Sequence, residues 1–235
     1  MKQEYSNYNE EDLLVWQTLF DRQKQNLQDK ACVEYITALD EMIEVLNHEE
    51  VPSFEKLNTW FSTRTGWKIH CVPGLIPVDE FFELLAQKKF SSSTWLRSMK
   101  QLDYLEEPDM FHDIFGHVPL LFNDVFSSFM ERFGKLGVRF RHDEQKLIQL
   151  QRLYWFTIEF GLINQNGLKI YGAGIASSFG ESNSSLHGPA IKVDYDLDEV
   201  LNQFFKNDEV QNKYFVIQNF EELFESINLL TEQWG

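Results

Sequence analysis

Two histidines and one glutamate in the middle of the chain have the residue types of a metal site. His112 and His117 lie five residues apart in the run His-Asp-Ile-Phe-Gly-His-Val, and Glu159 follows in the run Tyr-Trp-Phe-Thr-Ile-Glu-Phe-Gly. Two imidazoles and one carboxylate form the facial triad that binds a divalent first-row metal and leaves the other coordination positions open. Chemistry with O2 requires open positions, so these residues are candidate ligands of a non-haem iron(II) ion.

The spacing of the two histidines is unusual for ligands on one helix. Residues five apart on an ideal α-helix point about 140° away from each other. Zinc hydrolases of the His-Glu-x-x-His type instead place their histidines four apart on one face. Gly116 precedes His117 and Pro119 follows it, and both residue types interrupt helices. We therefore expect the helix to end there and the chain to bend, so that the second ring turns back toward the first.

The residues alone leave two interpretations of this cluster open. Nearby histidines are often hydrogen-bonded without a metal, and Arg152 could pair with Glu159 from two turns earlier on the same helix. A metal is favoured because Glu159 lies among apolar neighbours, where a carboxylate is costly unless it is paired or bound to an ion. Other active sites have less support, since the chain lacks a Gly-x-Ser-x-Gly motif and Gly-Ala-Gly at 172–174 lacks the third glycine of a dinucleotide-binding loop.

The composition is that of an acidic globular chain rich in aromatic residues. Of the 235 residues 43% are hydrophobic, and 21 are phenylalanine, which is ample for a core. The net charge of -16 disfavours a nucleic acid or an anionic membrane as partner. Cys32 and Cys71 suggest no disulfide framework, the first residues do not resemble a signal peptide, and no apolar run approaches the roughly 18 residues of a membrane span. We expect a cytoplasmic protein that binds small molecules.

Apolar residues at helical spacing, together with capping residues, predict the helices that would position the cluster. One helix is expected after Asn9 and another after Ser53, because both are good N-cap residues. A long helix rich in aromatic residues is expected over 147–163, and it would carry Glu159. The other predicted helices carry Tyr35 to Leu46, begin at Pro77, or begin near Asn219.

A few short strands are expected between the helices. Alternating apolar residues predict strands at 67–72, 168–171 and 214–217. The segment after residue 171 is rich in glycine, alanine and serine, and we expect it to be a loop. The predicted fold is therefore mainly α with a few short strands, of the α+β class.

The segment around the two histidines resembles that of a known family. Residues 102–121 read LDYLEEPDMFHDIFGHVPLL, which closely resembles the main motif of the pterin-dependent aromatic amino acid hydroxylases in their bacterial phenylalanine-4-hydroxylase branch. Residues 72–77, 154–162 and 171–181 resemble three further blocks of this family, in the same order. The resemblance covers about residues 10–230, so it implies a single catalytic domain over 1–235, with helices and loops around an iron cleft. The regulatory domain and tetramerisation helix of animal members are not expected, and the chain should be a monomer.

The resemblance also implies roles for individual residues. His112, His117 and Glu159 would hold Fe(II). The residues implied for a tetrahydropterin are Phe81, stacked on its ring, Gly74, Leu75 and Ile76 along its edge, and Asp113, which would reach it through water. The residues implied for the amino acid substrate and its surroundings are Arg97, Pro108, Trp155, Gly174, Ser177, Ser178 and Glu181. Arg97 would bind the substrate carboxylate, for which its fork of donors is suited.

The implied reaction is the hydroxylation of an aromatic L-amino acid by O2 and reduced pterin, with phenylalanine as the expected substrate and tyrosine as the product. Two positions depart from the family pattern. Asn207 stands where phenylalanine-specific members have an apolar residue and tyrosine hydroxylases have aspartate, and Ser184 replaces an aromatic or imidazole ring. Both bear on substrate choice, so hydroxylation of tyrosine or tryptophan is an alternative. A non-catalytic or zinc-loaded relative that binds an aromatic ligand is the alternative of another class.

Overall fold

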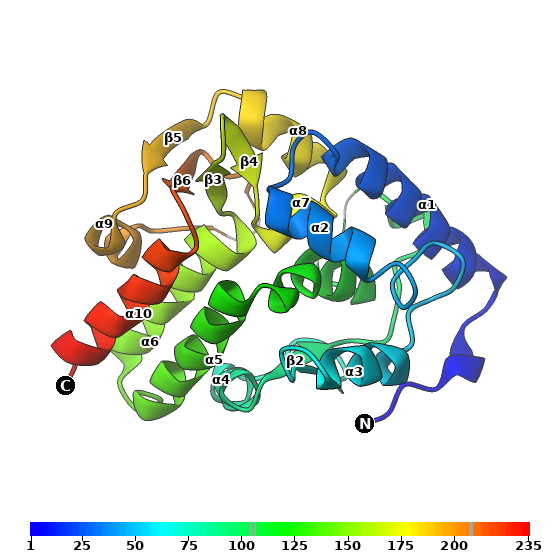
Figure 1. Cartoon of the computed structure of the whole chain (residues 1–235), viewed down its shortest axis with the longest axis horizontal. Coiled ribbons are helices and arrows are strands. Elements are labelled where there is room, and N and C mark those ends of the chain that lie inside the picture. Colours follow the sequence, from blue (N-terminus) through cyan, green and yellow to red (C-terminus); the bar gives the residue numbers. More distant parts are fainter. Residues whose placement is uncertain (104, 106, 207–208) are drawn as a thin grey trace.

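Helices make up most of the structure, a computed structural model that describes residues 1–103, 105, 107–206 and 209–235. Short strands connect some of them, so the predicted mainly α fold is confirmed (Figure 1). The α-helices are α1 (Glu10–Leu27), α2 (Val33–Glu41), α3 (Phe54–Ser62), α4 (Val78–Ala86), α5 (Asp124–Arg139), α6 (Glu144–Tyr154), α7 (Ala173–Ser177), α8 (Phe179–His187), α9 (Leu197–Asn202) and α10 (Glu221–Gln233). The strands are β1 (Lys68–Cys71), β2 (Lys89–Ser92), β3 (Leu162–Asn164), β4 (Leu168–Ile170), β5 (Ile191–Asp194) and β6 (Lys213–Ile217). None of the helices in the described ranges is long and apolar enough to cross a membrane.

Short helical turns of other types complete the chain. Three are 3-10 turns, at Tyr5–Asn7, Met99–Gln101 and Pro119–Phe122. Two are π-helical turns, at His112–His117 and Trp155–Glu159. The π-helix is rare and occurs mostly as single turns, which are frequent at functional sites. These two stretches therefore mark the region where a site is expected.

The helix starts that the sequence predicts after Asn9 and Ser53 are confirmed. At α1 the side chain of Asn9 accepts hydrogen bonds from the backbone N–H groups of Glu11 and Asp12, and the Asp12 carboxylate accepts one from the Asn9 N–H. Ser53 accepts one from the Lys56 N–H at the start of α3. Such reciprocal and single caps satisfy backbone donors that the first helical turn leaves free.

The strands form two small sheets. The larger has the order β4-β3-β6-β5, with β3 and β4 as an antiparallel hairpin and with β6 parallel to both β3 and β5. In the smaller, β1 pairs in parallel with β2. The connection between β1 and β2 contains α4, which carries Phe81. The strands β1, β4 and β6 lie where the sequence predicts strands.

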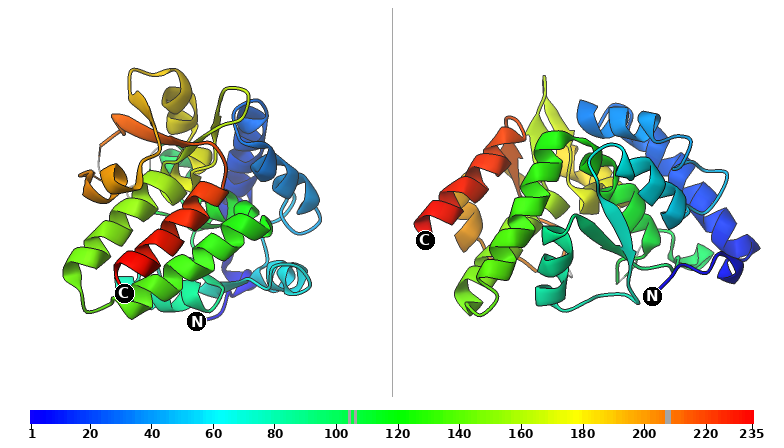
Figure 2. Two further views of the ribbon diagram at one scale, coloured as in Figure 1. Left: turned by 60° about the vertical axis from the view of Figure 1, so that its left-hand side comes forward. Right: turned by 60° about the horizontal axis from the view of Figure 1, so that its bottom comes forward.

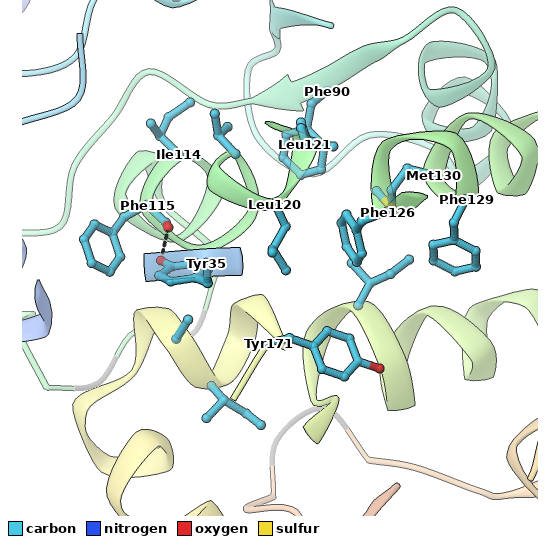
Figure 3. Close-up of a cluster of buried hydrophobic side chains, with 14 of the residues drawn as sticks. Tyr35, Phe90, Ile114, Phe115, Leu120, Leu121, Phe126, Phe129, Met130 and Tyr171 are labelled. Atoms are coloured by element: carbon cyan, nitrogen blue, oxygen red, sulfur yellow. Dashed lines mark hydrogen bonds between the residues drawn. The ribbon is translucent and has the colours of Figure 1, made fainter. Parts of the chain in front are cut away.

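A buried cluster of apolar side chains lies behind the first π-helical turn (Figure 3). Phe115, in that turn, stacks on Phe111 with ring centroids 4.8 Å apart. Its backbone carbonyl accepts a hydrogen bond from the hydroxyl of Tyr35 on α2 (Figure 3). Because Tyr35 is fully buried, this bond joins the backbone of the turn to α2, a helix that is distant in the sequence.

The helices α5, α6 and α10 lie side by side (Figure 2). Next to them, α4 packs closely on α5, since a Cβ at Gly134 would lie 2.3 Å from the backbone nitrogen of Ala86. A residue with a side chain at position 134 would push the two helices apart. The glycine therefore sets how deeply α4, and Phe81 on it, can approach the rest of the fold.

Three sequence predictions differ from the structure. The predicted helix over 147–163 begins earlier, at Glu144, changes to a π-helical turn after Tyr154, and gives way to β3 by Leu162. The predicted loop after residue 171 forms α7 and α8 instead, because Ser178 caps α8 by accepting a hydrogen bond from the Glu181 N–H. The predicted second helix is shorter, since α2 ends at Glu41.

Candidate metal and cofactor site

His112 and His117 lie at the two ends of the first π-helical turn. The helix ends at His117, as predicted, but the two rings meet for a reason other than the predicted bend. A π-helix closes its turns between residues i and i+5, so a spacing of five places the two side chains on the same face. Their Nε2 atoms are 3.2 Å apart, and the rings meet edge to face at a centroid distance of 4.9 Å.

Glu159 ends the second π-helical turn, which is closed by a hydrogen bond of 3.0 Å from the Phe160 N–H to the Trp155 carbonyl. Its Oε1 is 3.1 Å from His117 Nε2, and its Oε2 is 3.6 Å from His112 Nε2. The alternative partner proposed from the sequence points elsewhere, because Arg152 donates to the carbonyl of Leu201 at 2.9 Å. The structure thus brings one ligand atom from each of the three residues to within 4.8 Å of the others.

Two glycines let α7 approach the two turns. A Cβ at Gly116 would lie 2.8 Å from the carbonyl oxygen of Ala173, a distance that real Cβ atoms hardly ever show. A Cβ at Gly174 would lie 3.1 Å from Oε2 of Glu159. The backbone of α7 therefore covers both turns at close range and holds the triad between them.

The hydroxyl of Ser177 fixes the protonation of His112. Ser177 Oγ donates to the Ala173 carbonyl at 2.9 Å, so toward His112 it acts as an acceptor, with Nδ1 at 2.9 Å. An acceptor at this position favours the tautomer with the proton on Nδ1, in which the lone pair of Nε2 faces Glu159 and His117. Metal-binding histidines commonly have such a partner on the other ring nitrogen.

Burial and charge set the protonation states of the triad. Burial lowers the pKa of His112 to about 4, so the ring is neutral at pH 7. Burial alone would raise the pKa of Glu159, but His117 and His112 lower it to about 2, with a further contribution from the hydroxyl of Tyr154. Neutral imidazole and ionised carboxylate are the forms that bind a metal.

The distances among these atoms fit a divalent ion. With bonds of about 2.1 Å at right angles, neighbouring ligand atoms are about 3 Å apart. The observed separations of His117 Nε2 are 3.2 Å to His112 Nε2 and 3.1 Å to Glu159 Oε1, and His112 Nε2 lies somewhat farther, at 3.6 Å, from Glu159 Oε2. Two nitrogen donors and one oxygen donor on one face suit iron(II).

Arg97 lies in the segment after β2 and is held by a residue to which the sequence analysis gave no role. Its Nε and Nη2 donate to the two carboxylate oxygens of Asp109, each at 2.8 Å. Asp109 Oδ1 also accepts the backbone N–H of His112 at 3.1 Å. The same buried carboxylate therefore links the residue expected to bind a substrate carboxylate with a candidate metal ligand. An aspartate three residues before His112 was the sequence signal that could have identified Asp109 as part of the site.

The residues expected around the pterin differ in their contacts and in how far they are exposed. Asp113 accepts the Ser93 N–H at 2.9 Å, and burial raises its pKa to about 7. Phe81 meets Tyr154 edge to face at 5.3 Å. Tyr154, which the sequence analysis did not single out, also stacks on His117 at 6.1 Å. Tyr154 therefore contacts both Phe81, which is expected at the pterin, and His117 of the triad. Residues 74–76 form the exposed connection from β1 to α4, with Leu75 74% exposed.

The remaining residues expected at the substrate lie on several segments. Pro108 is half-buried and directly precedes Asp109. Trp155 is half-buried and opens the second π-helical turn. The Glu181 carboxylate accepts the Tyr214 hydroxyl at 2.6 Å. Ser178 is the N-cap of α8. Asn207, which bears on substrate choice, lies outside the described residues.

Comparisons with known proteins point in one direction. The model of the family described as "Biopterin-dependent aromatic amino acid hydroxylase" matches residues 3–233. The phenylalanine-4-hydroxylase of Chromobacterium violaceum is 47% identical over 228 residues, covering 96% of this chain and 76% of that protein. That of Ralstonia nicotianae is 44% identical, covering 96% and 72%. A crystal structure of the C. violaceum enzyme with bound iron(III) and 7,8-dihydrobiopterin has a TM-score of 0.92 at 46% identity, over 99% of this chain and 86% of that one.

Proposed function

Because the chain belongs to the family of biopterin-dependent aromatic amino acid hydroxylases, we propose that it converts L-phenylalanine to L-tyrosine with O2, a tetrahydropterin and a non-haem iron(II) ion. The relatives named phenylalanine-4-hydroxylase support the substrate. The iron and dihydrobiopterin bound in the C. violaceum relative support the two cofactors. The alternative of a non-catalytic or zinc-loaded relative has less support.

The observation that carries this proposal is the convergence of His112, His117 and Glu159. Their ligand atoms lie within 4.8 Å of one another, and His112 and Glu159 are in the protonation states that bind a metal. Only three protein ligands leave the other positions of an octahedral ion to O2 and solvent. We infer that these three residues hold the iron.

The other residues of the site would bind and orient the reactants. When bound, the iron and the reduced pterin supply the activation of O2 and two electrons. Arg97 would take the substrate carboxylate with the N–H groups that Asp109 leaves available. Phe81 would stack on the pterin, and Asp113 would reach it through water. Ser177 holds the His112 ring in the tautomer that a metal requires.

An unsubstituted ring suits the apolar surroundings proposed for the substrate. Trp155 stacks on Phe205 at 4.5 Å and lies against Phe160 at 4.7 Å, which supports an aromatic wall beside Pro108. A phenol would bury its hydroxyl there at a cost of about 1–3 kcal/mol unless a partner is present. We therefore propose phenylalanine over tyrosine, with tryptophan as a slower substrate.

Product analysis tests the proposal. Phenylalanine, tyrosine and tryptophan are offered separately with iron(II), tetrahydropterin and O2, the products are identified by mass spectrometry, and the bound metal is measured. We expect tyrosine from phenylalanine as the fastest reaction. Faster formation of dopa from tyrosine would change the substrate, whereas no oxygen uptake with iron bound would contradict the enzyme activity itself.

We also propose that the protein acts as a monomer in the cytoplasm. The net charge of -16 opposes self-association, and Cys32 and Cys71 are both buried and unpaired, as suits a reducing compartment. Light scattering over a range of concentrations tests the oligomeric state. A dimer or tetramer that persists on dilution would contradict the monomer.

A further inference from the structure

Gln211 is a buried amide in a connection whose other described residues are exposed or half-buried. It lies just before β6, and its side chain and backbone together are 8% exposed, whereas its neighbour Val210 is 73% exposed. Burying an amide is costly unless its hydrogen-bonding groups find partners. The position of those partners indicates what the residue does.

The side chain of Gln211 connects the indole of Trp155 to the backbone of its own segment. Its Oε1 accepts the Trp155 Nε1–H at 3.0 Å. Its Nε2 donates to the carbonyl of Glu209 at 3.0 Å and to that of Lys206 at 3.5 Å. An indole N–H can only donate and a carbonyl can only accept, so these partners determine which way the amide faces.

The backbone of Gln211 reaches a second residue expected at the substrate. Its N–H lies near the Glu181 carboxylate and opposes the rise in the pKa of that group that burial causes. Glu181 also accepts the Tyr214 hydroxyl at 2.6 Å. Gln211 therefore bonds Trp155 and lies near Glu181, although these two lie on different helical segments, the second π-helical turn and α8.

The ring of Trp155 is held on its faces by other aromatic residues. Phe205 stacks on it at a centroid distance of 4.5 Å and an angle of 16°, and Phe160 lies at 4.7 Å and 43°. Such contacts set the plane of a ring, but a half-turn about χ2 keeps that plane and exchanges the two edges of the indole. The directional bond to Gln211 selects one of the two orientations, so it fixes where the edge that carries the N–H points.

We propose that Gln211 is a positioning residue that orients Trp155 and thereby sets the affinity for the aromatic amino acid. This inference rests on the proposed function, because it takes Trp155 as a wall of the substrate site. Gln211 acts through Trp155 and does not itself touch the reacting atoms. Its loss should weaken binding of the amino acid while it leaves binding of the pterin and of iron unchanged.

The test compares two glutamines of the same connection. Gln211→Met keeps the length of the side chain and removes both hydrogen-bonding groups. Gln203→Met is the matched control, because Gln203 bonds Phe204 and Lys213 and has no bond to Trp155. We expect Gln211→Met to raise the KM for phenylalanine about tenfold, which corresponds to one lost hydrogen bond. The KM for the pterin and the iron content should not change, and the control should match the wild type.

A double-mutant cycle separates positioning from a general structural role. Trp155→Phe keeps an aromatic ring but lacks the N–H that Gln211 accepts. If Gln211 acts through the indole, Gln211→Met should add little in the Trp155→Phe background, since coupled residues are not additive. Additive effects, or equal increases in the KM for pterin and amino acid, would overturn the proposal.

Calorimetric titration with L-phenylalanine distinguishes the failure of this inference from the failure of the proposed function. A wild type that forms no tyrosine contradicts the proposed function, yet the titration still reports whether Gln211→Met weakens binding. A wild type that turns over normally, with unchanged binding in Gln211→Met, overturns only the role of Gln211. Thermal unfolding of each variant shows whether a loss of binding reflects a loss of folding.

Discussion

Asp109 and Arg97 form a buried, bidentate ion pair in which two parallel N–H···O bonds of 2.8 Å join the guanidinium to the carboxylate. Asp109 is fully buried and Arg97 is 8% exposed. Burial alone would raise the pKa of Asp109, but the bonds from Arg97 lower it overall, so the aspartate stays ionised. The pair therefore holds the guanidinium in a fixed place, where we propose that it binds the substrate carboxylate.

Asp109→Asn should destabilise the protein and weaken substrate binding. A buried guanidinium without its counter-charge costs about 3–5 kcal/mol, and Arg97 would no longer be held in place. We expect a lower free energy of unfolding in urea and a raised KM for phenylalanine. Asp103→Asn is the control, because Asp103 pairs with Arg22 at the surface with 80% of its side chain exposed, where a pair contributes about 1 kcal/mol or less. Equal effects of the two substitutions would contradict this role of Asp109.

Glu159→Gln should weaken iron binding and nearly abolish hydroxylation, because a charged ligand becomes a neutral one. Iron per chain is measured by mass spectrometry after dialysis, together with the rate of tyrosine formation. His48→Gln is the control, since His48 is exposed and pairs with Asp21 away from the triad. Full activity of Glu159→Gln with one iron per chain would show that Glu159 is not a ligand.

Ser177→Ala and Ser178→Ala should have different effects, although the two serines are adjacent. Ser177 binds Nδ1 of His112, and loss of such a partner typically lowers metal affinity about 10–100-fold. Ser178 caps α8, so its loss should cost about 1 kcal/mol of stability and leave metal affinity unchanged. Metal titration and urea unfolding of both variants distinguish the two roles. A Ser177→Ala variant with normal metal affinity would show that the hydroxyl does not matter for the ligand.

Phe81→Ala should raise the KM for pterin far more than the KM for phenylalanine. A stacked ring contributes about 0.5–1.5 kcal/mol beyond its buried area. Phe224→Ala serves as control, because Phe224 is half-buried on α10, where it packs against Arg132. Equal increases of both KM values would mean that Phe81 only supports Tyr154, with which it is in contact.

Local signals account for the parts of the fold that could be predicted. Asn9 and Ser53 start their helices through bonds to residues two or three positions away, so the sequence alone contains the necessary information. The segment 173–187 was predicted as a loop because glycine and serine have low helix propensity. There, packing of α7 against both π-helical turns outweighs propensity, and such contacts are not visible in a local pattern.

The site was predictable in its composition but not in its geometry. Histidine and glutamate in apolar surroundings favour a metal, and this inference does not depend on the backbone conformation. His112 and His117 meet as predicted, but the reason was misjudged, because a period of 3.6 residues was assumed and a π-helical turn does not follow it. The pairing of Asp109 with Arg97 depends on two segments that meet only in the folded chain.

Because of the two π-helical turns, the site depends on the number of residues in each turn as well as on which residues they are. Relative to an α-helix, a π-helical turn contains one additional residue. Deletion of one residue between His112 and His117 would leave the histidines four apart and let an ordinary α-helix form. It would also move or remove the residues between the histidines, including Phe115 and Gly116, whose backbone contacts Tyr35 and Ala173. We therefore expect natural variation in these turns to replace residues but not to add or remove them, and a one-residue deletion within 113–116 to abolish metal binding.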